Sequence, residues 1–308
     1  MTDEIVRTSL RGFPVRAVAV TTTEVTREAV RRHQAGQAGA LALGRGLTAG
    51  LLLATLTKDE ERVSLQVLGD GPLGGLTVDA SSAGTARGYV KNPHVAMNVA
   101  LPAASSAAAG RLSLAEVVGS AGVVSAVRDL GLRESFRGQT SLASGEIDED
   151  VERYLLESEQ IASALACDAV VAPDGTVMFA GGILLQALPG SDGAAIVAAA
   201  SEGLRVGLAR ILATRPENAE EIIIAALGER FGEIQLLDRR PVSFHCPCSR
   251  ARAATSLALL GNAELSQMIL DDGKAEVTCN FCRARYQFDE AELETIRREI
   301  SKSTAPAS

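Results

Sequence analysis

The cysteines are the residues of this chain whose spacing points most directly to chemistry. Four of the five form two close pairs, a CPC pair and a CNFC pair, toward the C-terminal end of the sequence. Two such thiol pairs are typical of a tetrahedral zinc site with four thiolate ligands. We therefore predict that one Zn²⁺ is bound by Cys246, Cys248, Cys279 and Cys282. Two other interpretations stay open: four unrelated buried thiols, or a redox-active CxxC beside an unrelated CxC.

Other candidate ligands and nucleophiles are weaker. Cys167 lies in the apolar, strand-like run 163–171, where a free cysteine packs as a small hydrophobic residue. His245 directly precedes the first pair and is an alternative ligand, although four cysteines already complete a tetrahedron. His33 and His94 have no partner pattern of serine, cysteine or carboxylate that would make either a catalytic base. We therefore predict no catalytic residues and a protein that is not an enzyme.

The composition is that of a globular protein with a small-residue aliphatic core. It is 46% hydrophobic and 22% charged, and tryptophan is absent. The length of 308 residues favours two units. The net charge of −8 disfavours a polyanionic partner, and residues 241–308 carry eight basic against nine acidic side chains. Because nucleic-acid binding needs a local excess of positive charge, we expect no nucleic-acid partner.

The chain carries no signal for export or for a membrane. Its first four residues include Asp3 and Glu4, where a signal peptide needs positive charge. The apolar stretch 35–57 contains Arg45 and five glycines, which indicates a buried core helix rather than a membrane span. We expect a cytoplasmic protein with reduced thiols.

The order of elements predicts an α+β fold in three parts. Residues 1–190 are expected to form a mixed sheet-and-helix domain, residues 191–240 a helical linker, and residues 241–308 a small zinc-binding module. The apolar runs 164–171 and 176–185 form a hairpin across the turn at 172–175. Further strands are expected at 15–23, 63–68, 76–80, 85–90, 122–129, 134–142, 276–279 and 284–288, and helices at 24–33, 147–160, 194–213, 217–230, 249–260 and 289–300.

The first linker helix contains two helix-destabilising residues. Gly203 and Gly207 lie inside the predicted helix 194–213, and each costs roughly 0.8–1 kcal/mol relative to alanine. Short helices depend on packing for their stability. The two linker helices are therefore either ordinary packed helices or a connector that unfolds easily.

Several motifs together resemble the heat shock protein 33 family, the 33 kDa chaperonin of bacteria. The C-terminal matches are FHCPCSR (244–250), CNFC (279–282) and YQF (286–288). The upstream matches, in the family's order, are GDGPL (69–73), RGYV (87–90), SEQI (158–161) and AGGILLQALPG (180–190). Together they span nearly the whole chain. One departure is Ala251, where the resemblance leads us to expect a glutamate; it leaves all four thiols in place and affects only local packing.

This resemblance implies a redox-regulated, ATP-independent holdase that acts in oxidative stress. The reduced, zinc-bound form of such proteins is inactive. Oxidants form two disulfides and expel the metal; the C-terminal module and the linker then unfold, homodimers form, and unfolding client proteins are bound. Carried over to this chain, the disulfides are Cys246–Cys248 and Cys279–Cys282.

The physics of a small module agrees with this expectation. A module of about 65 residues builds a core worth only about 3–5 kcal/mol, whereas structural zinc supplies about 10–16 kcal/mol. The metal would therefore decide whether the module folds. Two rival functions remain: a zinc-ribbon nucleic-acid-binding protein, disfavoured by the near-neutral module, and a thiol–disulfide oxidoreductase using the CNFC pair, disfavoured by the lack of a preceding βαβ pattern.

Overall fold

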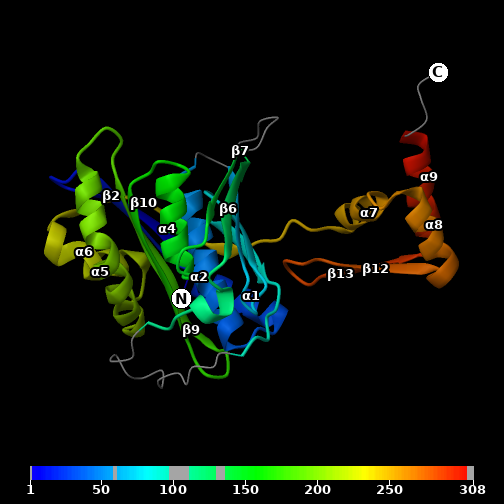
Figure 1. The fold of residues 1–308 in the computed structure, drawn as a ribbon, viewed down its shortest axis with the longest axis horizontal. Coiled ribbons are helices and arrows are strands. Elements are labelled where there is room, and N and C mark those ends of the chain that lie inside the picture. The colour runs from blue at the N-terminus through cyan, green and yellow to red at the C-terminus, as the bar shows by residue number, and fades with distance from the viewer. Residues whose placement is uncertain (1, 58–60, 97–110, 130–135, 304–308) are drawn as a thin grey trace. The chain divides into compact units, whose positions relative to one another are not determined.

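The computed structural model describes residues 2–57, 61–96, 111–129 and 136–303. The chain divides into two compact units, Met1–His245 and Cys246–Ser308. Both contain helices and sheet, so the predicted α+β class is confirmed (Figure 1). No helix of the described ranges is long and apolar enough to cross a membrane.

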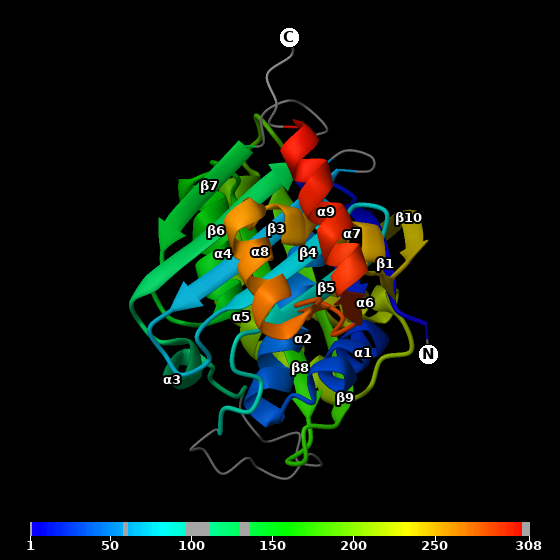
Figure 2. The same cartoon turned by 90° about the vertical axis from the view of Figure 1, so that its right-hand side faces the viewer.

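The first unit contains two sheets. One has the order β10-β1-β2-β9-β8 and is antiparallel throughout. The other has the order β11-β5-β4-β3-β6-β7, in which β11 runs parallel to β5. Figure 2 shows β5, β4, β3, β6 and β7 of this sheet side by side. The strands are β1 (Glu4–Leu10), β2 (Val15–Thr21), β3 (Arg62–Gly69), β4 (Leu76–Ser81), β5 (Thr85–Val90), β6 (Gly122–Asp129), β7 (Phe136–Ser141), β8 (Ser163–Val171), β9 (Val177–Ala187), β10 (Ile234–Pro241) and β11 (Ser243–Phe244).

Helix α2 (Gln37–Ala54) contacts strands of both sheets and is buried from Ala38 to Ala54. The glycines of α2 allow the strands of both sheets to pack closely against it. A Cβ at Gly44 would lie 2.6 Å from the Ala169 Cβ of β8, and one at Gly46 would lie 2.3 Å from a Leu76 methyl of β4. Arg45, fully buried between these glycines, forms ion pairs with Glu146 and Asp168 at 2.6 and 2.9 Å. The apolar stretch around Arg45 is thus a core helix, as predicted.

Two further helices of the first unit form a layer on the outside of the first sheet. Helices α5 (Gly193–Ala213) and α6 (Ala219–Phe231) pack on the sheet of β1, β2, β8 and β9 and share a hydrophobic core with it. This core includes Phe179, Ile183, Leu204, Leu208 and Ile222. The other helices are α1 (Thr23–His33), α3 (Ala115–Val118) and α4 (Ile147–Glu157).

The second unit is small. It consists of α7 (Arg250–Ala258), α8 (Gly261–Asp272), the antiparallel pair β12 (Lys274–Thr278) and β13 (Arg285–Asp289), and α9 (Glu290–Ser303). Its core of buried residues is formed by Ala253, Leu257, Leu265, Ala275, Phe288, Leu293 and Ile296. This core is small, because most residues of the second unit are exposed or half-buried.

Most expected elements are present, including the antiparallel β8–β9 hairpin. The differences concern strands and helices with weak sequence patterns. Residues 234–240, assigned above to a helical linker, belong to strand β10, which pairs with β1. The short elements β11 and α3 were not expected either, nor were β1 and α8. The start of the expected strand 134–142 lies outside the described residues. The three-part division itself stays a prediction.

Candidate metal centre

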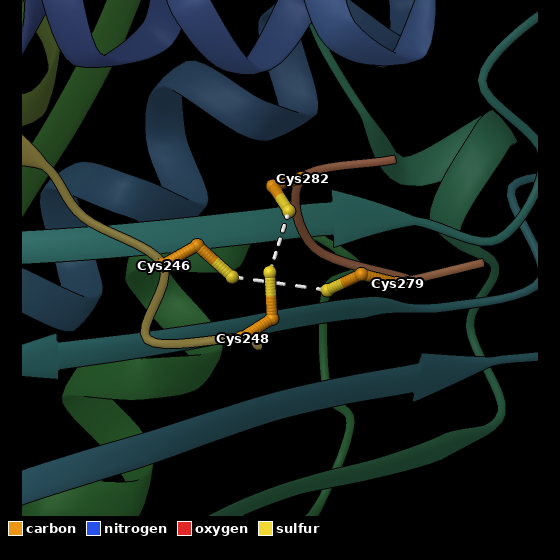
Figure 3. A group of neighbouring side chains, drawn as sticks. All are labelled: Cys246, Cys248, Cys279 and Cys282. Atoms are coloured by element: carbon orange, nitrogen blue, oxygen red, sulfur yellow. Dashed lines mark hydrogen bonds between the residues drawn. The ribbon is translucent and has the colours of Figure 1, made fainter. Parts of the chain in front are cut away.

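The four cysteines of the two pairs converge on one point. Their sulfur atoms all lie within 4.8 Å of one another (Figure 3). The Sγ atoms of Cys246 and Cys279 are 3.7 Å apart, and those of Cys248 and Cys282 are 3.2 Å apart. Four sulfurs at 2.3 Å from a zinc ion would be about 3.8 Å from one another, because that is the edge of such a tetrahedron. The donor set therefore fits Zn²⁺, which would be held by these four thiolates.

Local structure positions each pair. Cys279 and Cys282 lie in the turn between β12 and β13, where the Cys279 N–H donates to the Ala284 carbonyl at 2.9 Å and the Arg283 N–H donates to the Cys279 carbonyl at 2.9 Å. Arg283 adopts a φ of 61°, which closes the turn. Cys246 and Cys248 lie on the extended segment before α7, whose first turn is capped by the Ser249 hydroxyl.

Burial makes the sulfurs of Cys279 and Cys282 poor thiolates without a cation. It raises the pKa of Cys282 to about 12, and it also raises the pKa of Cys279. Backbone N–H groups oppose this effect: those of Phe281 and Cys282 donate to the Cys279 sulfur, and that of Ala284 donates to the Cys282 sulfur. A bound divalent cation would supply the charge that keeps four neighbouring sulfurs ionised.

The other two candidate ligands, Cys167 and His245, belong to the first unit and not to the unit that contains the cluster. The structure has all five cysteines as thiols outside any disulfide. Cys167 belongs to β8 in the first unit and is completely buried, and this burial raises its pKa well above the ordinary value. Its predicted burial is confirmed. His245 is exposed, and its N–H donates to the Ala86 carbonyl at 3.1 Å. Among the described residues, the converging metal-ligand set consists of the four cysteines and does not include His245.

Two side chains outside the thiols belong to the site, and sequence reasoning assigned neither a role. The Tyr286 hydroxyl donates to the Cys248 sulfur at 3.2 Å. That hydrogen bond raises the pKa of Tyr286 to about 12. Arg250 stacks over the Phe288 ring at 4.5 Å and forms an ion pair with Glu292 at 2.6 Å, which fixes the start of α7 against β13 and α9. The YQF motif was the available signal for Tyr286.

Comparisons with known proteins agree with the geometry. The family model described as "Hsp33 protein" matches residues 3–289. The "33 kDa chaperonin" of Bacillus licheniformis is 39% identical over 298 residues, covering 97% of this chain and all of that protein. That of Gloeobacter violaceus is 43% identical over 314 residues, covering 97% of each chain. The crystal structure of the HSP33 homolog from Thermotoga maritima superposes with a TM-score of 0.82 at 30% identity, covering 98% of this chain and all of that one. This chain therefore belongs to the Hsp33 family.

Proposed function

We propose that this protein is a redox-regulated, ATP-independent chaperone that holds unfolding proteins after oxidation. The observation that carries the proposal is the convergence of four cysteine thiols in a small unit with a minor core of its own. The relatives' name, 33 kDa chaperonin, supports the chaperone class. The clients are unfolded or oxidatively damaged proteins, and neither nucleic acid nor a membrane is needed for the activity.

The metal would act as the fold-determining element of the second unit. A module of this size supplies only about 3–5 kcal/mol from its core. Structural zinc supplies about 10–16 kcal/mol of apparent binding energy at neutral pH. The four thiolates that bind the metal are also the sulfur species that oxidants attack. Cys246, Cys248, Cys279 and Cys282 would thus be both ligands and sensors.

The redox step balances with a peroxide as oxidant. One thiolate attacks a peroxide oxygen, the O–O bond breaks, and a sulfenic acid and hydroxide form. A second thiolate displaces hydroxide from the sulfenic sulfur and forms the S–S bond. Two electrons pass from two sulfurs to the peroxide, and two protons complete two water molecules. Sulfurs bonded to each other no longer provide thiolate ligands, so the metal is released.

The pairing Cys246–Cys248 and Cys279–Cys282 follows from the family resemblance. The two short sulfur distances join thiols of different pairs, as expected when every ligand of a tetrahedron neighbours every other. Disulfide loops this short restrain the unfolded chain little, so they cannot replace the lost metal energy. The second unit is therefore expected to unfold after oxidation.

Client binding requires newly exposed apolar surface. Helices α5 and α6 cover one face of the first sheet, and their removal would uncover side chains such as Phe179, Ile183 and Leu185. This arrangement supports a linker that shields the client-binding face in the reduced protein. We further propose that the activated protein forms a homodimer and works in the cytoplasm, where thiols are reduced until stress occurs.

Light scattering of a heat-denaturing client tests the proposal. The oxidised protein is expected to suppress aggregation without ATP, and the reduced protein is expected not to. Metal analysis should find one Zn²⁺ per reduced chain and none after oxidation. Insulin reduction by the reduced protein, or a salt-dependent shift with RNA or DNA, would favour the oxidoreductase or nucleic-acid interpretation instead.

A further inference from the structure

Tyr286 is held in contact with the thiol cluster without being a ligand. Its hydroxyl donates to the Cys248 sulfur at 3.2 Å. Its backbone lies on β13 opposite Val277 of β12, and its ring packs against the small core of the second unit. Two independent contacts, the strand pairing and the core packing, therefore hold the phenol in place. A tyrosine hydroxyl is protonated at neutral pH and can donate one hydrogen bond.

A hydrogen bond to a thiolate changes the reactivity of that sulfur. Hydrogen bonds to an ionised acceptor are stronger than those between neutral groups. When the sulfur attacks an electrophile, its negative charge passes into the new bond and the hydrogen bond weakens. The donor therefore stabilises the resting thiolate more than the transition state, and oxidation slows.

The donors to the neighbouring sulfurs are of a different kind. Cys279 accepts from the N–H groups of Phe281 and Cys282, and Cys282 accepts from that of Ala284. These peptide donors are fixed by the turn between β12 and β13. Tyr286, by contrast, is a side-chain donor that a single substitution removes while the turn stays unchanged.

We propose that Tyr286 is a positioning residue of the redox switch, whose hydrogen bond orients the Cys248 thiolate and slows its reaction with peroxide. The inference rests on the proposed function for its biological role, but the chemistry of the bond can be tested separately. With Tyr286 in place, oxidation starts at the other thiolates, and Cys248 reacts late. The side chain thereby sets the amount of peroxide that is needed before the metal is lost.

The matched test is Tyr286→Phe, which removes one oxygen atom and keeps the ring. In the zinc-loaded, full-length protein, peroxide should release the metal about threefold to tenfold faster than in wild type, equivalent to losing part of a charge-assisted hydrogen bond. Mass spectrometry of alkylated thiols should place the increase at Cys248. With Co²⁺ as the probe, the sulfur-to-metal charge-transfer band should move to lower energy while the d–d bands stay tetrahedral. Tyr89→Phe, the same change in the first unit, should leave all three readouts at wild-type values.

Two outcomes overturn the inference. One is a wild-type rate of release and of Cys248 alkylation in Tyr286→Phe. The other is an equal acceleration of all four thiols with altered d–d bands, which would mean that the tyrosine only holds the fold. If Tyr286→Phe binds no metal, 3-fluorotyrosine at position 286 decides, since its more acidic phenol is a stronger donor: slower release supports the role and an unchanged rate refutes it. Failure of oxidised wild-type protein to hold a client would overturn the proposed function while leaving these thiol kinetics unaffected.

Discussion

Helix α5 should become harder to open when its two internal glycines are replaced. It buries a regular apolar face that includes Val197, Leu204 and Leu208. Gly203 and Gly207 lie away from that face, have helical rather than positive φ, and a Cβ at either position would meet no atom within 4 Å. No steric requirement in the structure accounts for glycine at these positions. Their effect is on the stability of the helix.

The magnitude follows from helix propensity. A Cβ at either glycine would enter open space, so each Gly→Ala change is expected to stabilise α5 by about 0.8–1 kcal/mol, and Gly203→Ala with Gly207→Ala gives about 1.5–2 kcal/mol. The opening equilibrium of the helix should fall about 10- to 30-fold. The reverse change at an exposed position of the same helix, Ala198→Gly, should raise it about 4- to 5-fold.

Hydrogen exchange of peptides from α5 in the reduced, zinc-bound protein measures this opening directly. Aggregation suppression at limiting peroxide then shows whether the opening matters. The double variant should need more oxidant or a higher temperature than wild type, and Ala198→Gly should need less, while all three proteins release zinc at the same rate. If α5 exchange shifts as expected but the oxidant requirement does not move in either direction, the opening of α5 is not part of activation.

Three further predictions concern other sites. Cys167→Ser should leave activation by peroxide intact, because this thiol is buried and burial raises its pKa. Cys282→Ser should lower the zinc content and make aggregation suppression partly independent of oxidant. The opposite pattern would place the switch in the first unit. Burial raises the pKa of Asp3 from 3.8 to about 6, so this carboxyl's contribution to stability is complete below pH 3.8 and is lost as pH rises through 6. Asp3→Asn should therefore flatten the dependence of the unfolding free energy on pH between about 4 and 6, as measured by denaturant titration. An unchanged profile would contradict this. Chelation of zinc from the reduced protein should expose residues 246–303 to limited proteolysis while residues 2–57 and 136–190 resist. Cleavage spread equally over both units would refute their separate stability.

The thiol cluster could be predicted from sequence because ligand type and spacing are local properties. One residue separates Cys246 from Cys248 and two separate Cys279 from Cys282, so a local turn is enough to bring both sulfurs of each pair to one ion. The β8–β9 hairpin was equally accessible, because two apolar runs are joined by a turn at 172–175. In these regions each local pattern points to one structure.

Strands β1 and β10 could not be predicted, because they are defined by pairing with each other and not by a local sequence pattern. β10 lies at the edge of its sheet, and most of its side chains are exposed, including Leu236 and Leu237, so no alternation of apolar and polar residues marks it. Its partner β1 lies more than two hundred positions earlier in the sequence. The Tyr286 hydrogen bond was inaccessible for a similar reason: strand alternation places its side chain on a face but does not identify the sulfur that its hydroxyl reaches.

The chain crosses from one sheet to the other directly before Cys246, the first of the four clustered cysteines. Pro241 ends β10, and Ser243–Phe244 then pairs with β5 in the second sheet. The Val242 N–H donates to the Asp3 carbonyl at 2.8 Å, and the Arg32 guanidinium lies 4.9 Å from the centre of the Phe244 ring.

If the second unit unfolds on loss of a bound metal, as proposed above, unfolding that spreads from it along the chain meets this crossing before helices α6 and α5. The backbone hydrogen bonds here contribute about 1 kcal/mol each, and the exposed edge strand β10 buries little apolar surface behind them. The larger resistance comes next, where α5 and α6 bury their leucines and isoleucines against the first sheet. Under the proposed function, the packing of these two helices, weakened in α5 by Gly203 and Gly207, would be the step that separates loss of the metal from exposure of the sheet.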